Sequence, residues 1–144
     1  MAWNPDIRDA LVARLAGITV TLPNAQAIKK VYATPPATIQ DLPCFIVYPP
    51  RREVNRGPAG RQVLYTVRCR CLVTDADLSV GADLVDAFSE ATIARIEGDI
   101  KLAEAPVVGH VCEEGSGFKY GSTNYVGFDL VLTLNVRTAF AATA

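Results

Sequence analysis

The sequence predicts an α+β fold, in which an antiparallel or mixed β-sheet has two helices packed on one face and ends in a long C-terminal β-hairpin. Two segments, 61–73 and 125–137, alternate apolar and polar residues as long strands do. Two others, near the N-terminus and at 78–97, repeat apolar residues at helical spacing. A chain of 144 residues fits one domain, which buries roughly 70% of the surface its unfolded chain exposes. We therefore expect a single domain over 1–144, with 138–144 as a loose tail.

The first helix is predicted from its start signal and its apolar spacing. Asn4-Pro5-Asp6 supplies an N-cap side chain, a proline at the first helical position and an acid in the first turn. Apolar residues then follow every four positions, at Ile7, Leu11 and Leu15. Gly17 is a typical helix stop, so the segment predicts a short amphipathic helix.

Between this helix and the central strand we expect short strands separated by prolines. Residues 27–32 and 44–48 favour strands, 18–22 alternates weakly, and 38–42 can form one helical turn. Residues 49–60, PPRREVNRGPAG, hold three prolines, two glycines and three arginines, so we expect a loop there.

The central strand, residues 61–73, has the clearest two-residue period in the chain. Its apolar face comprises Val63, Tyr65, Val67, Cys69, Cys71 and Val73. Arg68 and Arg70 lie on the other face, two positions apart. Because this strand is long and rich in β-branched residues, we expect it in the middle of an antiparallel sheet, with its arginine face turned to partners.

The second half of the chain predicts a covering helix and a hairpin. Residues 78–97 carry an apolar stripe, and Gly98 follows as a C-terminal signal. Residues 107–112 favour a strand, 115–117 and 121–124 favour turns, and 125–137 favours the second long strand. This helix is the best candidate to cover the sheet.

Charge is divided along the chain although the formal net charge is only −1. Residues 29–70 hold eight Lys or Arg against two acids, which gives +6, and residues 71–144 hold four against eleven, which gives −7. The first 28 residues cancel, so the sum is −1. The split can be an accident of a scattered surface charge. Alternatively, copies of the chain meet basic side to acidic side, as subunits do in a closed ring with a heterologous interface.

We expect no enzyme and no cofactor. The chain has one histidine and no spacing typical of a nucleophile motif or a phosphate-binding loop. Cys69 and Cys71 with His110 and Cys112 could form a Cys₃His zinc site if their strands pair, but residues two apart on a strand lie about 7 Å apart, which is wide for one zinc. A core lined by cysteines and a redox role are the alternatives. No apolar run reaches the length of a membrane span, and we expect a reducing cytoplasm.

Six arginines are the candidate partner or inter-subunit contacts: Arg51, Arg52, Arg56, Arg61, Arg68 and Arg70. Three interpretations remain open for them. They can be solvated, they can form an arm that docks on an acidic neighbour, or they can contact a phosphate backbone. The loop has no aromatic residues, so a surface that stacks single-stranded bases is not expected.

Taken in order, these segments resemble the tail terminator (tail completion) proteins of long-tailed bacteriophages. The resemblance covers most of residues 5–138 and rests on the order of the segments and on their residue patterns. The helix IRDALVARLAGI comes first, then KKVYATPPATIQDLPCFIVYP, in which DLP precedes a strand, then the arginine-rich segment and GRQVLYTVRCRCLV. The helix LVDAFSEATIARI and the strand NYVGFDLVLTLNV complete it.

The resemblance implies a structural virion protein without catalytic residues. Such a protein forms a ring, expected to be hexameric, which binds the tail tube, ends tail growth and offers a joining surface to the head connector. It implies a place in the neck of the virion, assembly in the bacterial cytoplasm, and passage of DNA through the ring without sequence-specific binding. Two alternatives stay open: a head-side neck adaptor or stopper protein, and a small zinc-binding domain.

Overall fold

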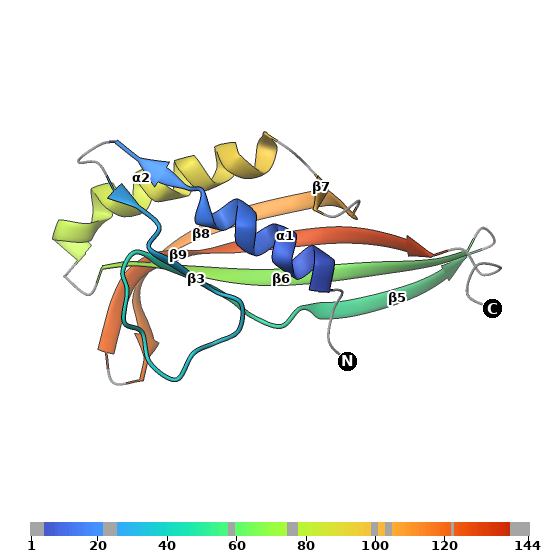
Figure 1. Cartoon of the computed structure of the whole chain (residues 1–144), viewed down its shortest axis with the longest axis horizontal. Coiled ribbons are helices and arrows are strands. Elements are labelled where there is room, and N and C mark those ends of the chain that lie inside the picture. Colours follow the sequence, from blue (N-terminus) through green and yellow to red (C-terminus); the bar gives the residue numbers. More distant parts are fainter. Residues whose placement is uncertain are drawn as a thin grey trace.

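The computed structural model describes residues 5–21, 26–57, 60–74, 78–98, 101–102, 105–121 and 123–138. The chain has an α+β fold, with two helices against a mixed and largely antiparallel sheet (Figure 1). The expected loose tail at 138–144 lies outside the described residues except for Thr138, and so does the N-cap candidate Asn4.

The main sheet has seven strands. Six follow the order β3 (Lys30–Tyr32), β4 (Cys44–Val47), β6 (Gly60–Thr74), β9 (Thr123–Thr138), β8 (Ala105–Tyr120) and β7 (Lys101–Leu102). The seventh, β5 (Arg51–Gly57), pairs with β6 on the same side as β4. Among the described strand pairs, only β3 and β4 are parallel. A separate pair of short strands, β1 (Thr19–Val20) and β2 (Gln26–Ala27), lies near the helices.

Both helices bury their apolar side on one face of the sheet. Helix α1 (Pro5–Ala16) contributes Ile7, Leu11 and Leu15, each at most 1% exposed. Helix α2 (Leu78–Glu97) contributes a second set, of which Phe88 is fully buried. They meet the apolar positions of β6 and β9, which are 0 to 7% exposed. We call this the helix face of the sheet and the opposite side the open face.

The sheet extends past the helices at one end, and the β8–β9 hairpin bends away at the other (Figure 1). Beyond the helices, β5, β6 and β9 continue as an arm, which ends at the register Arg56↔Arg61 and Gly57↔Gly60. At the opposite end, β8 and β9 curl as a hairpin, and Gly121 makes its turn with a φ of 63°. The turn expected at 121–124 is thus confirmed at Gly121.

Four local expectations were wrong. The single strand expected at 27–32 is divided between β2 and β3, which belong to different sheets. Residues 51–57 form strand β5 instead of a loop, because all seven pair with β6 through their backbone. Neither face of β5 is apolar enough to show a two-residue period in the sequence. Residues 38–42 form bends without a helical turn. Residues 115–117 continue β8, whose register shifts between Ser116 and Phe118, so the glycines accommodate a bulge and not a turn.

Gly127 permits the close approach of β9 to β6. A Cβ built at this position would lie 1.8 Å from the carbonyl oxygen of Cys71, which is backbone and cannot move aside. Any larger residue would therefore push the two central strands apart at the point where both faces of the sheet are buried.

Candidate contact surfaces

A buried carboxylate holds two arginines on the open face. Asp129 of β9 has a side chain only 5% exposed, and it is the direct neighbour of Arg70 in the β6–β9 register. Arg70 donates from Nε to Oδ1 at 2.8 Å and from a terminal nitrogen to Oδ2 at 3.0 Å. Arg68 donates to Oδ2 at 2.5 Å. The carboxylate thus receives a two-pronged contact from one arginine and a third bond from the other.

This arrangement fixes the charge of the carboxylate. Burial by itself would raise the pKa of Asp129, but the hydrogen bonds and positive charge of Arg70 and Arg68 outweigh it, so the pKa is lowered from its ordinary value. The hydrogen bond to Asp129 likewise raises the pKa of Arg70, against the opposing effect of burial. The three groups carry a net charge of +1, and Arg68 remains about half exposed.

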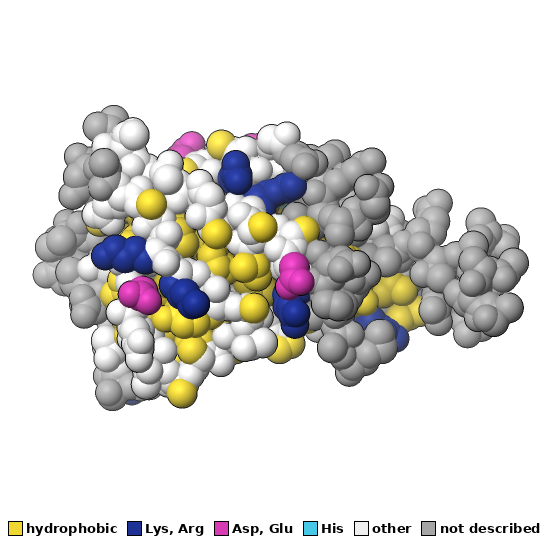
Figure 2. Space-filling view, viewed as in Figure 1, with side chains coloured by type: hydrophobic (Ala, Val, Ile, Leu, Met, Phe, Trp, Pro, Cys, Tyr) yellow, Lys and Arg dark blue, Asp and Glu magenta, His cyan; other side chains and the backbone are white. Residues whose placement is uncertain are grey.

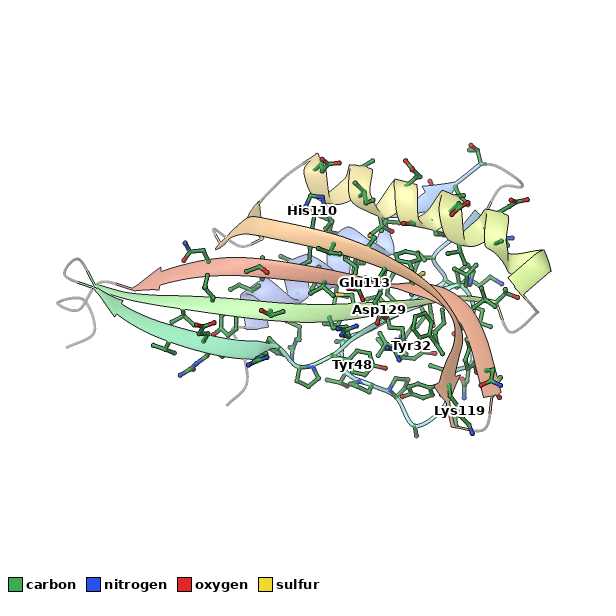
Figure 3. All side chains as sticks on the ribbon, turned by 180° about the vertical axis from the view of Figure 1, so that it is seen from behind. Tyr32, Tyr48, His110, Glu113, Lys119 and Asp129 are labelled. Carbon is green, nitrogen blue, oxygen red and sulfur yellow. The ribbon has the colours of Figure 1, made fainter. Side chains whose placement is uncertain are left out.

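Aromatic side chains surround Arg70 at the bent end of the sheet. Its guanidinium lies 4.3 Å from the ring centre of Phe118 on β8 and 5.9 Å from that of Tyr48. Tyr120 donates its hydroxyl hydrogen bond to the carbonyl of Pro36, which ties the hairpin to the segment between β3 and β4. Figure 3 shows Tyr32, Tyr48 and Asp129 on this side, with Lys119 on the curled hairpin.

This end of the open face forms a second apolar cluster. It is made of Cys44, Ile46, Leu72 and Tyr125, with six partly buried neighbours. Leu72 belongs to it while the adjacent Cys71 belongs to the helix-face core, and both are fully buried. The sheet is therefore covered on both faces at the bent end.

The rest of the open face is not covered by any described element. Thr66 and Arg68 of β6 are exposed there, Val131 and Thr133 of β9 are half-buried, and Val111 of β8 is 54% exposed. Glu113 lies beside Asp129 on β8 and is exposed. This face mixes charged, hydroxyl and apolar groups, which is typical of a surface that contacts another protein.

The six candidate arginines have three different environments. Arg51 and Arg52 are exposed on β5, one on each face of the sheet. Arg56 and Arg61 pair with each other in the backbone register at the end of the arm, and their side chains lie outside the description. Arg68 and Arg70 instead hold Asp129, so the fold itself uses two of the six.

Sequence reasoning missed Asp129 as the partner of these arginines. Its place on the polar side of 125–137 was the available signal, because an acid on a polar strand face can meet a basic neighbour. The neighbour could not be assigned, since the pairing Arg70↔Asp129 spans 59 residues.

The strand order places the basic segment of the sequence on one side of the sheet. Strands β3, β4, β5 and β6 all come from the basic segment 29–70 or its continuation, and they occupy one side. Strands β9, β8 and β7 occupy the other side and carry three acids and three Lys or Arg, so most of the acidic charge of 71–144 lies outside them, with four acids on helix α2. The network around Asp129 lies on the seam between the two sides.

The cysteines and the histidine do not form a metal site. β9 lies between β6 and β8, so Leu130 separates Cys69 from Cys112, and the two strands are about 10 Å apart. Among the described residues there is no group of three or more potential metal ligands. Burial raises the pKa of Cys44 to about 12 and raises those of Cys69 and Cys71 as well, so these thiols stay protonated in the core.

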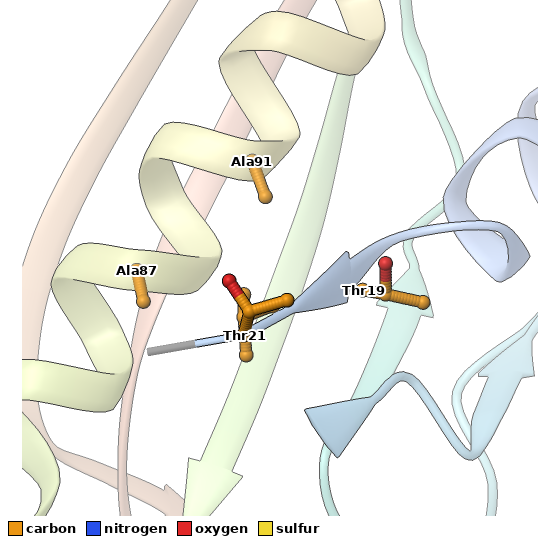
Figure 4. A pocket seen from close by; sticks show the side chains of 5 residues that line it. Thr19, Thr21, Ala87 and Ala91 are labelled. Atoms are coloured by element: carbon orange, nitrogen blue, oxygen red, sulfur yellow. The ribbon is translucent and has the colours of Figure 1, made fainter. Parts of the chain in front are cut away.

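Two open hollows of the described surface hold neither a nucleophile with a base nor a set of metal ligands; the one of about 390 Å³ is lined by Arg14, Ala94, Arg95 and Gly98. The other, of about 270 Å³, lies between α2 and β1 and is lined by Thr19, Val20, Thr21, Ala87 and Ala91 (Figure 4). On the side seen in Figure 2, Lys and Arg are separated by hydrophobic and uncharged groups, so the described residues there make no continuous basic track. No helix of the described chain is both long and apolar enough to cross a membrane.

A scan against protein-family models finds no match, and a search of curated proteins finds no similar sequence. The features of the molecule that bear on its function are therefore the sheet, its edges and the distribution of charge.

Proposed function

We propose that this chain is a ring-forming structural protein of the neck of a long-tailed bacteriophage, a tail terminator. Copies of the chain assemble side by side into a closed ring of about six subunits. The ring caps the tail tube, ends its growth and offers a joining surface to the head connector. The protein performs no catalysis in this role.

One observation carries the proposal: the basic strands β3 to β6 lie on one side of the sheet, whereas helix α2, which carries four acids and one arginine, packs mainly over β9 and β8 on the other. A surface that is basic on one side and acidic on the other is complementary to a copy of itself placed side by side. Such a head-to-tail contact is heterologous, so it continues from copy to copy until the rotation closes a ring. The proposal also draws on the resemblance in element order stated above.

The first test measures mass in solution by light scattering over a range of protein concentrations, at low and at high salt. We expect a mass near six subunits, or a monomer that assembles as concentration rises and salt falls, since exposed charge pairs are screened by salt. A monomer under every condition would contradict a self-assembling ring.

A charge-reversal variant tests the arm. Arg52→Glu/Arg56→Glu should weaken assembly and reduce capping of tail tubes, because it removes basic charge from β5. Arg8→Glu, on helix α1, is the control and should assemble as the unmodified chain does. If the β5 variant formed rings and capped tubes unchanged, the arm would not be a contact.

Partner choice separates the tail-side role from the head-side alternative. A pull-down with the tail tube protein and with the portal protein of the same phage should retain the tube. Retention of the portal alone would instead identify an adaptor or stopper of the head side.

A further inference from the structure

We infer that neighbouring copies join through their sheets, with the β5 edge of one copy paired to the β8 edge of the next. This inference rests on the proposed ring and names the surfaces that form it. The partner is a second copy of this chain, and the bond is a backbone ladder with charged side chains across it.

Both edges are open among the described strands. β5 pairs with β6 alone, over all seven of its residues. β8 pairs with β9 along its length, but on its other side it meets only β7, at Ala105 and Pro106. The edge from residue 107 to 120 therefore has no described strand beside it. Long open edges present unpaired backbone groups that another strand can satisfy.

The two large hydrophobic side chains that are exposed in the described chain lie on these two edge strands. Val54 of β5 is 40% exposed and Val111 of β8 is 54% exposed. Each is an apolar group on a strand edge, where an added strand would cover part of it.

Strand direction permits the contact without turning one copy over. β5 is antiparallel to β6, β6 to β9, and β9 to β8, so β5 and β8 of one chain run in opposite directions. Two copies set side by side with the same face outward therefore bring β5 against β8 as an antiparallel pair. The same operation repeats at every subunit, which a closed ring requires.

Charge favours this pairing over a two-fold dimer. β5 carries three arginines and one glutamate, whereas Glu113 and Glu114 follow each other on β8. A two-fold pairing of β5 with β5 would bring arginine-rich edges together, and β8 with β8 would bring glutamates together. The β5 to β8 contact instead sets the arginine-rich edge beside the two adjacent glutamates.

The faces of the sheet restrict the register. Arg51 pairs with Thr66, which pairs with Thr133, and directly paired residues share a face, so Arg51 lies on the open face. Glu113 lies on the same face, because it pairs with Asp129. An antiparallel register with Arg51 opposite Glu113 sets Glu53 opposite Val111, again on the open face. If two copies stood side by side with no offset along the strands, Arg51 of one would lie beside Gly109 of the next. The register with Arg51 opposite Glu113 therefore offsets neighbouring copies by four residues. Closing a sheet into a ring requires such an offset, called shear.

The test uses cysteine cross-linking in a Cys112→Ala background, since the other three native thiols are fully buried. Chains carrying Glu53→Cys are mixed with chains carrying Val111→Cys and oxidised. We expect a disulfide-linked dimer in the mixture and none in either variant alone. Asp9→Cys, exposed on α1, is the control and should yield no linked dimer with Val111→Cys.

Light scattering on the same samples separates this inference from the proposed function. An oligomer that gives no linked dimer in the mixture would overturn the edge pairing and leave the ring standing. Linked dimers of Glu53→Cys alone would show two-fold pairing and overturn the inference. A monomer at every concentration would overturn both the edge pairing and the self-assembling ring.

Discussion

The two ends of strand β6 differ in what covers them. At the bent end, Cys71 and Leu72 are adjacent and fully buried, one under the helices and the other under the aromatic cluster. At the arm end, β6 is bordered by β5, whose four described side chains from Arg51 to Val54 are all exposed. One end of the strand thus holds the fold together, and the other presents a paired but uncovered surface. Mutations at the two ends should differ accordingly.

The largest effect is expected from Gly127→Ala. Its new Cβ would meet the Cys71 carbonyl oxygen, so β9 and β6 must separate at the doubly buried end. We expect a loss of more than about 3 kcal/mol in the free energy of unfolding, or failure to fold.

Gly109→Ala on β8 is the matched control for that change. The nearest atom to its Cβ is 3.9 Å away, an ordinary contact, so urea unfolding should change by less than about 0.5 kcal/mol. Equal losses at both glycines would show that the close approach at Gly127 is not what restricts the bent end.

Core truncation gives the next comparison. Phe128→Ala removes a fully buried ring that packs edge-on against Phe45, with ring centres 5.9 Å apart. The expected loss is about 3 to 5 kcal/mol. Val54→Ala in the arm should cost less than about 1 kcal/mol, because that side chain is 40% exposed. Thermal unfolding of both variants checks this, and a larger loss at Val54 would contradict an uncovered arm.

A smaller loss is expected at the seam. Asp129→Asn keeps the size of the side chain but leaves Arg70 and Arg68 without their counter-charge, and we expect a loss of about 2 to 3 kcal/mol in chemical unfolding. Glu113→Gln, the exposed neighbour on β8, should change stability by less than about 0.5 kcal/mol. Similar losses in the two variants would show that the burial of Asp129 does not increase its contribution to the free energy of unfolding.

Protonation of Asp129 at low pH should lower the stability of the folded chain. The pKa of Asp129 is lower in the folded chain than in the unfolded chain, where it is about 3.9, so the unfolded state binds more protons in this range. The stabilisation is complete above the unfolded pKa and is lost as pH falls through the folded pKa. Urea midpoints measured from about pH 5 downward should fall more steeply for the unmodified chain than for Asp129→Asn. Parallel slopes would contradict a lowered pKa.

Local patterns predicted the elements that bury one face. The expected helix at 78–97 coincides with α2, and the strand expected at 125–137 lies within β9. Both are amphipathic over many residues, so their period is visible in the sequence. Strand β5 was missed because it is exposed on both faces and has no apolar period to detect. Its structure comes from backbone pairing with β6, which no local pattern reports.

The sequence by itself determined the fold class, the buried side of each helix and long strand, and the opposite charge of its two halves. These depend on composition and on the spacing of neighbouring residues. Only the tertiary structure decided that β9 lies between β6 and β8. That order keeps Cys69 and Cys112 apart, brings Asp129 to Arg70, and leaves β5 and β8 as opposite edges. Strand order and register depend on contacts between distant segments, whose free energy includes the closure of long loops and the packing of whole faces.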